Sequence, residues 1–351
     1  MVSISLRIKG EKIVAEGDIS ALKKRGFGDE SNGDFLLNPY EALYLMEERG
    51  IPIKRGKKAL SSFDFMKLAQ RAMEGFDILY LAYRDLRKRG YVVRDARPHA
   101  HFKVYERGKK PGKAVARYWL MVSGEHDVFC PRKIMEYIIS AYNARKLPIY
   151  ALIDDEGDVV YYGLGVKSPR GPFSKPKNDN EQPIPARIQP TRVVCPIERS
   201  YHLHESRFFG KPCGNTLILS HHEALYLKEC GIIDLFSPKS NRKVGEEYLR
   251  RVARKYDKMF EHKYRVYRDL TNRGLILKTG LKYGTHFRAY DEHPDIAHAR
   301  YLVHTLIINE CEEWFKISRA VRLAHGVRKE ILLAIVHGRG IKYIFAKRLR
   351  P

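Results

Sequence analysis

The chain has 351 residues, and its 65 lysines and arginines exceed its 41 aspartates and glutamates by 24, which favours a polyanionic partner such as nucleic acid. A hydrophobic fraction of 44% excludes wholesale disorder, and neither a bilayer-spanning apolar run of about 20 residues nor a signal-peptide core is present, so we expect a cytoplasmic protein without a membrane partner. Five cysteines, odd in number and without a CxxC pair, exclude a disulfide framework and a zinc ribbon.

The first strongly periodic segment lies between residues 64 and 89. Apolar side chains recur there at three- and four-residue steps, which predicts one long helix with a buried stripe. Gly90 is suited to cap its C-terminus. The pattern then alternates between strands and a helix. The predicted elements are strands over 91–93, 102–105 and 118–122, a helix over 131–145, and strands over 149–153 and 159–162.

A proline-rich stretch follows over residues 166–192. It holds six of the 17 prolines and few large apolar side chains. Such a composition predicts an extended, semi-stiff linker that continues neither a sheet nor a helix.

After this stretch the chain repeats itself. Glu41-Ala-Leu-Tyr-Leu45 recurs as Glu223-Ala-Leu-Tyr-Leu227, and Tyr83-Arg-Asp-Leu86 recurs as Tyr267-Arg-Asp-Leu270. Three further matches keep the same order at nearly the same offset: Phe76 with Phe260, Ala116-Arg-Tyr118 with Ala299-Arg-Tyr301, and Arg145-Lys146 with Arg328-Lys329. Ordered matches at one offset indicate a tandem duplication.

The predicted fold is therefore a duplicated α/β (α+β) architecture. Each copy has an N-terminal α+β subdomain and a C-terminal α/β subdomain in which helices pack on a mixed sheet. The expected bounds are 1–165 for the first copy with subdomains 1–90 and 91–165, 166–192 for the linker, and 193–351 for the second copy with subdomains 193–274 and 275–351.

The two copies differ in one set of reactive side chains. The second copy has Tyr290 after a predicted strand, His298 eight residues later, and Lys329 at a predicted helix-to-strand junction. The first copy has Val115 where the second has His298. A residue that only one copy carries is a candidate for function rather than fold.

These three residue types suit RNA cleavage through the 2′-hydroxyl. The histidine can protonate the leaving 5′-oxygen, and the lysine can stabilise charge on the phosphorus oxygens. The tyrosine can remove the 2′-proton if nearby cations lower its pKa. A packed ring, a satisfied histidine and a solvated ammonium are the alternative interpretations of the same residues.

Several motifs of the second copy resemble the archaeal tRNA-splicing endonuclease (tRNA-intron endonuclease) family. They are Tyr267-Arg-Asp-Leu270, Arg273-Gly-Leu-Ile-Leu-Lys-Thr-Gly-Leu-Lys-Tyr-Gly284, Phe287-Arg-Ala-Tyr290, His298-Ala-Arg-Tyr-Leu-Val303 and Val321-Arg-Leu-Ala-His-Gly-Val-Arg-Lys329. The first copy is similar as a degenerate repeat. The length resembles that of the homodimeric type, in which each chain joins a pseudo-catalytic and a catalytic unit.

The resemblance implies a reaction and a fold. The family cuts precursor tRNA at bulge–helix–bulge junctions without a metal or other cofactor, and leaves 2′,3′-cyclic phosphate and 5′-hydroxyl ends. Its C-terminal units are restriction-endonuclease-like. In this family Tyr290 would be the general base, His298 the general acid and Lys329 the stabilising cation. Arg322 and Arg348 would clamp a flipped bulge base from the opposite active subunit.

An acidic run lies between two predicted strands of the first copy. It contains Asp154, Asp155, Glu156 and Asp158, whereas the second copy has His337-Gly-Arg-Gly340 at this place. The family docks an acidic loop of one unit into a basic groove of a neighbour, so the resemblance implies a dimer contact here. An ordinary hairpin with a charged tip is the alternative.

Two other functions stay open on the sequence alone. One is a non-catalytic RNA-binding scaffold with the same duplicated fold. The other is a metal-dependent DNA nuclease, which the C-terminal architecture suggests. Our first expectation is a metal-independent endonuclease that binds precursor tRNA as a homodimer.

Overall fold

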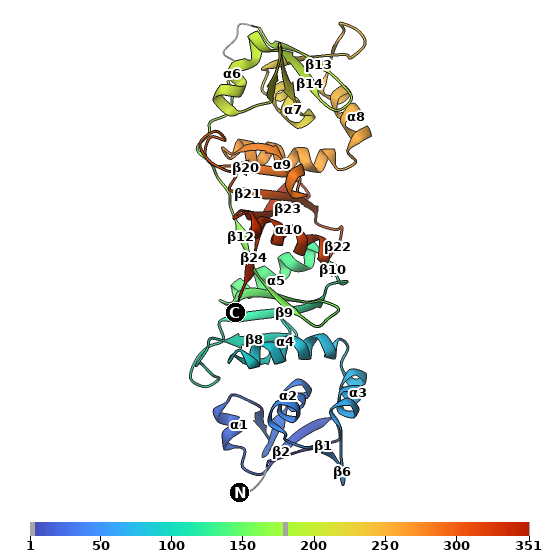
Figure 1. Ribbon diagram of the computed structural model, residues 1–351, viewed down its shortest axis with the longest axis vertical. Coiled ribbons are helices and arrows are strands. Elements are labelled where there is room, and N and C mark those ends of the chain that lie inside the picture. Colours follow the sequence, from blue (N-terminus) through green and yellow to red (C-terminus); the bar gives the residue numbers. More distant parts are fainter. Residues whose placement is uncertain (1–3, 178–181, 351) are drawn as a thin grey trace. The chain divides into compact units, whose positions relative to one another are not determined.

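The computed structural model describes residues 4–177 and 182–350, so part of the predicted linker, residues 178–181, lies outside the described residues. The chain divides into two compact units, and each contains a six-stranded N-terminal sheet of its own (Figure 1). Unit 1 contains Met1–Gly165, Glu312–Ile317 and Lys347–Pro351, and unit 2 contains Val166–Cys311 and Ser318–Ala346.

The N-terminal subdomain of the first copy is a six-stranded sheet in the order β3-β4-β2-β1-β5-β6. Its helix α2 begins at a capping box, in which Glu41 reaches back to the backbone N–H of Asn38, and ends at Gly50 with φ of 64°. The elements are β1 Ser5–Lys9, β2 Lys12–Glu16, α1 Ser20–Lys24, β3 Asp29–Ser31, β4 Asp34–Leu37, α2 Pro39–Arg49, β5 Ile53–Arg55, β6 Lys58–Ala59 and α3 Ser62–Ala72.

The second copy repeats this subdomain strand for strand. Its sheet has the order β15-β16-β14-β13-β17-β18, and the capping box recurs at Ser220 and Glu223. The elements are β13 Ile184–Ile188, β14 Val193–Pro196, α6 Ile197–Arg207, β15 Lys211–Cys213, β16 Thr216–Leu219, α7 His221–Glu229, β17 Ile233–Phe236, β18 Lys243–Val244 and α8 Glu246–Tyr256. The predicted duplication of the fold is confirmed.

The strand β13 lies inside the stretch predicted as a linker. Ile184, Ala186 and Ile188 are fully buried and alternate with outward-facing residues. Pro185 is tolerated because the antiparallel pairing with β14 involves only Arg187 and Ile188. The expectation that 166–192 contains no strand is therefore wrong for residues 184–188.

The C-terminal subdomains also repeat each other. The first copy has strands in the order β7-β8-β9-β11-β12, and the second has β19-β20-β21-β23-β24. The pairs β9–β11 and β21–β23 are parallel, and the other pairs within each set are antiparallel. A helix follows β9 and another follows β21, as a parallel crossover requires.

Most predicted strands of these subdomains are present, although β12 continues five residues beyond its predicted end, to Lys167, and so enters the predicted linker. In the first copy the elements are α4 Phe76–Lys88, β7 Val92–Asp95, β8 Phe102–Tyr105, β9 Tyr118–Gly124, β10 Val128–Phe129, α5 Pro131–Asn143, β11 Leu147–Ile153 and β12 Val159–Lys167. In the second copy they are α9 Phe260–Asn272, β19 Ile276–Thr279, a 3-10 turn Leu281–Tyr283, β20 Phe287–Tyr290, β21 Tyr301–Ile307, β22 Glu312–Glu313, α10 Trp314–Gly326, β23 Glu330–His337 and β24 Gly340–Leu349.

The long helix predicted in each copy is two helices. In the first copy Gly75 separates α3 from α4 in a left-handed conformation with φ of 68°. In the second copy Asp257 is extended between α8 and α9, and its side chain accepts a hydrogen bond from the N–H of Met259 at 3.0 Å. The apolar spacing continues across both breaks, which is why the pattern indicated a single helix.

A short segment of the second copy belongs to unit 1. β22 pairs with β10, and the following Trp314 is almost fully buried. Its ring packs edge-on against Phe129 at 4.8 Å and lies 4.3 Å from the ring of Tyr150. The core of unit 1 is therefore completed by residues that follow β21 in the sequence.

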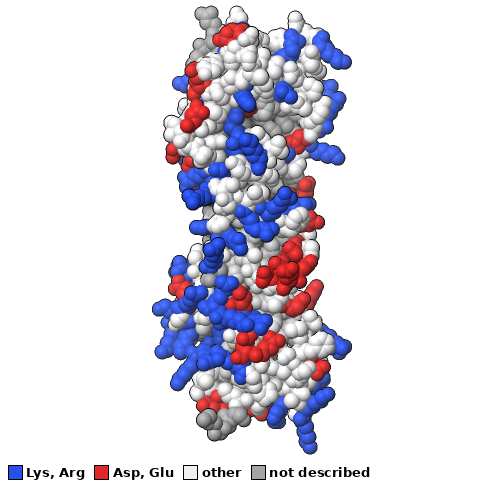
Figure 2. All heavy atoms as spheres, in the orientation of Figure 1, with Lys and Arg blue, Asp and Glu red and all other residues white. Residues whose placement is uncertain are grey.

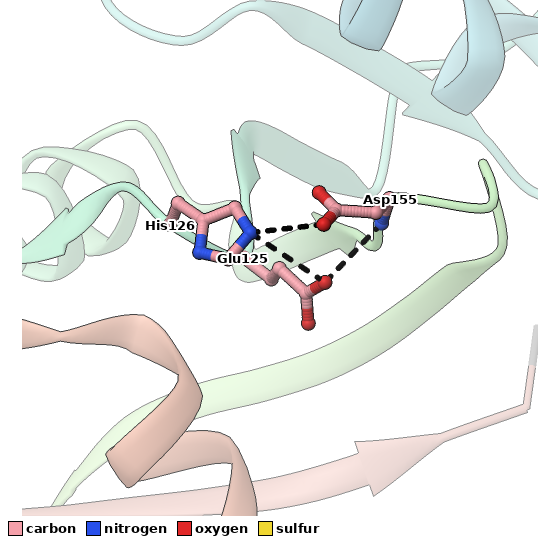
Figure 3. A group of neighbouring side chains, drawn as sticks. All are labelled: Glu125, His126 and Asp155. Carbon is pink, nitrogen blue, oxygen red and sulfur yellow. Dashed lines mark hydrogen bonds and ion pairs between the residues drawn. The ribbon is translucent and has the colours of Figure 1, made fainter.

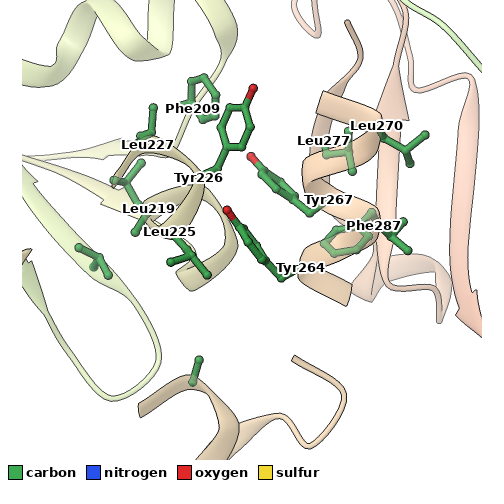
Figure 4. Close-up of a cluster of buried hydrophobic side chains, with 14 of the residues drawn as sticks. Phe209, Leu219, Leu225, Tyr226, Leu227, Tyr264, Tyr267, Leu270, Leu277 and Phe287 are labelled. Carbon is green, nitrogen blue, oxygen red and sulfur yellow. The ribbon is translucent and has the colours of Figure 1, made fainter. Parts of the chain in front are cut away.

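In unit 2 one hydrophobic core runs through both subdomains (Figure 4). Tyr226 of α7 and Tyr267 of α9 meet edge to face with ring centroids 6.1 Å apart. The labelled side chains are Phe209, Leu219, Leu225, Tyr226 and Leu227 from the N-terminal subdomain, and Tyr264, Tyr267, Leu270, Leu277 and Phe287 from the C-terminal one. The two subdomains of this copy are thus packed as one body.

A buried ion pair also joins the two subdomains in each copy. In the second, Lys278 of β19 lies 2.8 Å from Glu223 of α7 and donates to the carbonyl oxygens of Phe208 and Gly210, both at 2.9 Å. In the first, Arg94 lies 3.1 Å from Glu41. Because both copies keep an acid in the buried helix and a cation in the strand, the pair belongs to the fold.

Cys195, Cys213 and Cys230 are free, whereas Cys130 and Cys311 are each disulfide-bonded. The expectation that the cysteines form no disulfides is therefore wrong for these two. Within residues 4–177 and 182–350 there is no helix with the length and hydropathy that crossing a bilayer demands.

Candidate active site

Two of the predicted catalytic residues lie at one edge of the C-terminal sheet of unit 2. Ala289 of β20 pairs with Tyr301 of β21, and Tyr301 pairs with Glu330 of β23. Tyr290 follows Ala289 at the end of β20, and Lys329 directly precedes Glu330. The strand pairing therefore places Tyr290 and Lys329 at the same end of the strands. Each lies one residue beyond a paired residue, Ala289 or Glu330.

His298 lies in the loop that connects β20 to β21. It is exposed, and its side chain has no hydrogen bond or ion pair with any residue that the structure describes. The loop is anchored on both sides of it, because Ala299 is buried against Tyr290 and the ring of His293 packs edge-on against Phe208 at 5.4 Å. The imidazole is thus held near the sheet edge with both ring nitrogens available to a ligand.

Tyr290 is only 7% exposed, and it packs with Ile276, Ala299, Phe173 and Phe208. Burial raises the pKa of its phenol above the usual 10.0, and the guanidinium of Arg288, 5.8 Å from the ring centre, lowers it by a smaller amount. The hypothesis that cations lower this pKa is right about the arginine and wrong about the net direction. In the free chain the phenol keeps its proton at neutral pH.

Lys329 is half-buried, and its ammonium lies 5.9 Å from the ring centre of Tyr283. It has no carboxylate partner within the described ranges. Arg328 precedes it with φ of 54°, and Arg145 has φ of 56° at the same place in the first copy. Because both copies keep this left-handed residue, the turn that presents the lysine is part of the fold.

The acidic groups around the site are neutralised by other cations. Arg300 lies 2.7 Å from Asp291 and 3.3 Å from Glu330, and Lys167 also pairs with Glu330. Partial burial acts to raise the pKa of Glu330, but these two cations hold it below its usual value. Lys329 is therefore left to meet an anionic ligand.

The two arginines expected to clamp a base lie in different units. Arg322 is exposed on α10 in unit 2, and Arg348 is half-buried near the end of β24 in unit 1. Neither has a carboxylate partner among the described residues. Their joint action on one base stays a prediction.

His286 has a structural environment instead of a catalytic one. Its Nδ1 accepts the backbone N–H of Thr305 at 2.9 Å, and its ring stacks on His304 at 4.7 Å. Burial, with a smaller effect of His304, lowers the pKa of His286 to about 3. His101 in the first copy accepts the N–H of Val122 at the same distance, so this histidine is a duplicated fold feature.

The acidic run forms a tight turn between β11 and β12. Oδ1 of Asp154 accepts the N–H groups of Glu156 at 3.1 Å and Asp158 at 2.8 Å, which fixes the turn from inside. Asp155, Glu156 and Asp158 are exposed at its tip. The loop therefore presents three carboxylates on a rigid support.

A histidine lies beside this turn (Figure 3). Nε2 of His126 is 3.1 Å from Oδ2 of Asp155, and the N–H of Asp155 donates to Glu125 at 3.2 Å. The hydrogen bond and charge of Asp155 raise the pKa of His126. The three ligand atoms lie within 4.8 Å of one another. A raised pKa favours the protonated imidazole, which pairs with a carboxylate and competes with metal binding.

A basic pocket of about 550 Å³ lies between the two subdomains of the second copy. Lys263 and Lys278 in its wall are paired with Asp257 and Glu223. The walls also carry Lys211 and Arg288, which have no carboxylate partner among the described residues. No spacing in the sequence indicates this pocket, although Lys278 and Arg288 both lie in motifs of the second copy that carry the family resemblance.

Known proteins match this chain over both copies. The model for the N-terminal domain of tRNA intron endonucleases matches residues 4–66 and 184–250, and that for the catalytic C-terminal domain matches 76–161 and 260–343. The tRNA-splicing endonuclease of Methanococcoides burtonii is 32% identical over 350 residues, 98% of each chain, and that of Methanosarcina mazei is 32% identical over 361 residues, 99% of each. A shorter tRNA-splicing endonuclease, from Hyperthermus butylicus, is 37% identical over 171 residues, 94% of its length and 45% of this chain.

Proposed function

Because the chain belongs to the tRNA intron endonuclease family and is an endonuclease that excises introns from tRNA, we propose that Tyr290, His298 and Lys329 of its second copy carry out the cleavage. The observation that supports this most is that strand register puts Tyr290 and Lys329 at the same end of their strands, while the exposed His298 lies in the loop after Tyr290 and has no partner among the described residues. In the first copy the place of that histidine is taken by Val115, which is 78% exposed.

In this proposal the 2′-oxygen attacks the adjacent phosphorus and the bond to the 5′-oxygen breaks. Tyr290 removes the 2′-proton when it is in its phenolate form, which burial disfavours and the charge of Arg288 favours to a smaller degree. His298 gives a proton to the leaving 5′-oxygen, and Lys329 stabilises the charge that gathers on the phosphorus oxygens. The products are a 2′,3′-cyclic phosphate and a 5′-hydroxyl. None of these steps needs a metal or another cofactor.

A chain with one catalytic copy needs a partner to cut both ends of an intron within one complex. We therefore propose a homodimer with two active sites, in which the first copy is pseudo-catalytic. Arg322 and Arg348 would hold the flipped bulge base for the site of the other chain. A cytoplasmic location, with precursor tRNA as substrate, belongs to the same proposal.

The chain alone should cleave an RNA with a bulge–helix–bulge motif in the presence of EDTA. The expected products end in 2′,3′-cyclic phosphate and 5′-hydroxyl, which separate on gels after acid or phosphatase treatment. A strict requirement for Mg²⁺, or a preference for DNA, would support the alternative of a metal-dependent nuclease instead. Intact RNA under all conditions would support a scaffold function.

We propose that the acidic turn of each chain docks into the basic pocket of its partner's second copy. The turn offers Asp155, Glu156 and Asp158, and the pocket offers Lys211 and Arg288 without carboxylate partners. Charges of opposite sign on two preformed surfaces set the register of such a contact and speed the encounter of the chains.

Replacing Glu156 and Asp158 with arginine should shift the dimer towards monomers and lower cleavage in parallel. Asp154 is kept, so the turn retains its internal hydrogen bonds. Sedimentation equilibrium at several concentrations and salt levels measures the effect. The matched control is Glu11→Arg with Glu74→Arg, two exposed acids elsewhere in the same copy.

A second variant tests which surface receives the turn. Adding Lys211→Glu and Arg288→Glu to the reversed turn restores opposite charges, and the dimer should partly recover. If the reversed turn leaves the dimer as stable as the control does, the docking proposal is wrong.

A further inference from the structure

The first copy contains a basic groove that the cleavage mechanism does not use. It is a pocket of about 260 Å³ at the ends of α1, α2 and α4, closed on one side by the loop after β8. Figure 2 shows lysine and arginine side chains gathered on this side of the first copy, over α1 and that loop. The cations that line the groove are Lys24, Arg25, Arg49, Arg87, Lys109 and Lys110.

No salt bridge among the described residues neutralises these six cations, although Arg87 and Lys24 also act at longer range on Glu41 and Asp18. The residues lining the groove include no aspartate or glutamate, and none of the six cations has an ion pair with any described residue. Like charges gathered in one concave site repel one another, and the concave shape strengthens the positive potential. The groove is therefore suited to a ligand with several negative charges.

The groove is also held in place before any ligand arrives. The guanidinium of Arg87 lies over the ring of Phe27 at 3.8 Å and donates to the carbonyl oxygen of Arg25 at 3.0 Å. Lys110 donates to the carbonyl oxygen of Lys24 at 3.4 Å, which ties the loop to α1. Binding an anion here requires little reordering of the walls.

In the second copy the place that corresponds to this groove is filled by a segment of the chain. Gly274 corresponds to Gly90, which lines the groove of the first copy. The segment after β12 runs against Gly274, whose carbonyl oxygen accepts the N–H of Phe173 at 3.1 Å. The ring of Phe173 lies 5.6 Å from the guanidinium of Arg207, the counterpart of Arg25. In the second copy, therefore, a piece of the chain itself packs there.

The residues at the two places differ accordingly. Arg87 of the first copy corresponds to Thr271, which is buried, and Lys24 corresponds to Ser206. The duplication thus has these cations only where the groove is open. At these two positions the fold of the second copy does without a cation, whereas Arg25 keeps an arginine counterpart in Arg207.

We propose that the groove of the first copy binds backbone phosphates of the RNA substrate. This inference rests on the proposed function, and it assigns the non-catalytic copy a direct contact with RNA. Lysine and arginine bind phosphate oxygens strongly and without regard to base sequence. The groove therefore adds affinity and orientation but no choice of cleavage site.

The test removes three exposed cations that have no partner: Lys24→Ala, Arg49→Ala and Lys109→Ala in one chain. The matched control removes Arg55, Lys57 and Lys58, three exposed cations of the β5–β6 hairpin in the same copy. The probe is an intron-containing precursor tRNA with 2′-deoxy nucleotides at both junctions. Filter binding from 50 to 300 mM KCl gives the Kd and its salt dependence for each chain.

We expect the groove variant to bind about tenfold or more weakly at 0.15 M salt, with a slope of log K against log salt reduced by about 2, because about 0.7–0.9 counterions are released per phosphate contact. The single-turnover cleavage rate of cleavable RNA at saturating enzyme should stay at the wild-type level. Lys109→Ala alone should show the same changes to a smaller degree.

Two results would overturn the inference. One is a groove variant whose Kd and salt slope equal those of the hairpin control. The other is loss of the dimer in sedimentation without a change in RNA affinity per dimer, which would identify an acidic protein segment as the occupant. Failure of the proposed function would look different, because the wild-type chain itself would then leave the precursor uncleaved.

Discussion

The His298→Ala variant is expected to cleave precursor tRNA ~10²–10⁴-fold more slowly than the wild type while binding it with similar affinity. The reason is that a positioned general acid contributes about this factor when the leaving oxygen is poor. The side chain is exposed and has no partner among the described residues, so its removal leaves the fold intact. Single-turnover rates at saturating enzyme, in EDTA, measure the effect.

The duplication supplies a matched control for this variant. Val115→Ala changes the corresponding position of the first copy and should leave the rate within about twofold. An RNA with sulfur in place of the leaving 5′-oxygen tests the role itself, because a thiolate leaves without a proton. The His298→Ala variant should cleave that RNA at nearly the wild-type rate. Equal slowing on both RNAs would show that His298 positions the substrate instead.

The second large effect concerns stability. Lys278→Ala should destabilise unit 2 by about 3–5 kcal/mol, because it leaves Glu223 as a buried charge without its partner. Glu223 would keep only the N–H groups of Gly210 at 2.9 Å and Ser220 at 2.8 Å. The carbonyl oxygens of Phe208 and Gly210 would also lose their shared donor.

The loss should depend on pH in a defined direction. Burial acts to raise the pKa of Glu223, but Lys278 and two backbone N–H groups hold it below the usual 4.5. A lowered pKa contributes stability above that usual value, and the contribution disappears as the pH falls through the folded-state pKa. In the Lys278→Ala chain burial raises the pKa instead, so Glu223 destabilises the fold above pH 4.5. The difference between the two chains is therefore largest near neutrality and shrinks below about pH 4.5.

The unfolding of unit 1 and of unit 2 can be followed by two different measurements. Both tryptophans, Trp119 and Trp314, belong to unit 1, so their fluorescence reports its unfolding in urea. Hydrogen exchange of peptides from α7 and β19 reports unit 2. Only the second should change in Lys278→Ala, and Glu223→Gln with Lys278→Met should recover part of the loss. A Lys278→Ala chain with unchanged exchange in these peptides would contradict the prediction.

The local spacing of apolar and polar residues was enough to predict many of the strands and helices. β8 has the predicted bounds, because a short alternating run between turn residues has few other solutions. The duplication identified Tyr290, His298 and Lys329 as a set through the contrast with Val115. The buried ion pair could also have been predicted, since the repeated Glu-Ala-Leu-Tyr-Leu motif keeps an acid among apolar residues in both copies.

Features set by distant parts of the chain could not be predicted in this way. The pKa of Tyr290 depends on burial by Phe173 and Phe208, which are far from it in sequence. The strand β13 was hidden because Pro185 and the prolines around the strand outweighed a three-residue alternation. The basic groove of the first copy requires α1, α4 and the loop after β8 to meet, and no spacing in the sequence shows this.

The contribution of Trp314 to unit 1 has a consequence for how the chain is made. The first copy leaves the ribosome long before residues 312–317 and 347–350, yet Trp314 packs on its Phe129 and Tyr150, and Leu349 packs against its hydrophobic core. Folding one domain after another during synthesis is the usual order for long chains. Here the first copy must wait with an unfilled gap beside Phe129 and Tyr150 until translation is nearly complete. A nascent chain that ends before Trp314 should therefore be a client for chaperones, even though every residue of its first copy has already been made.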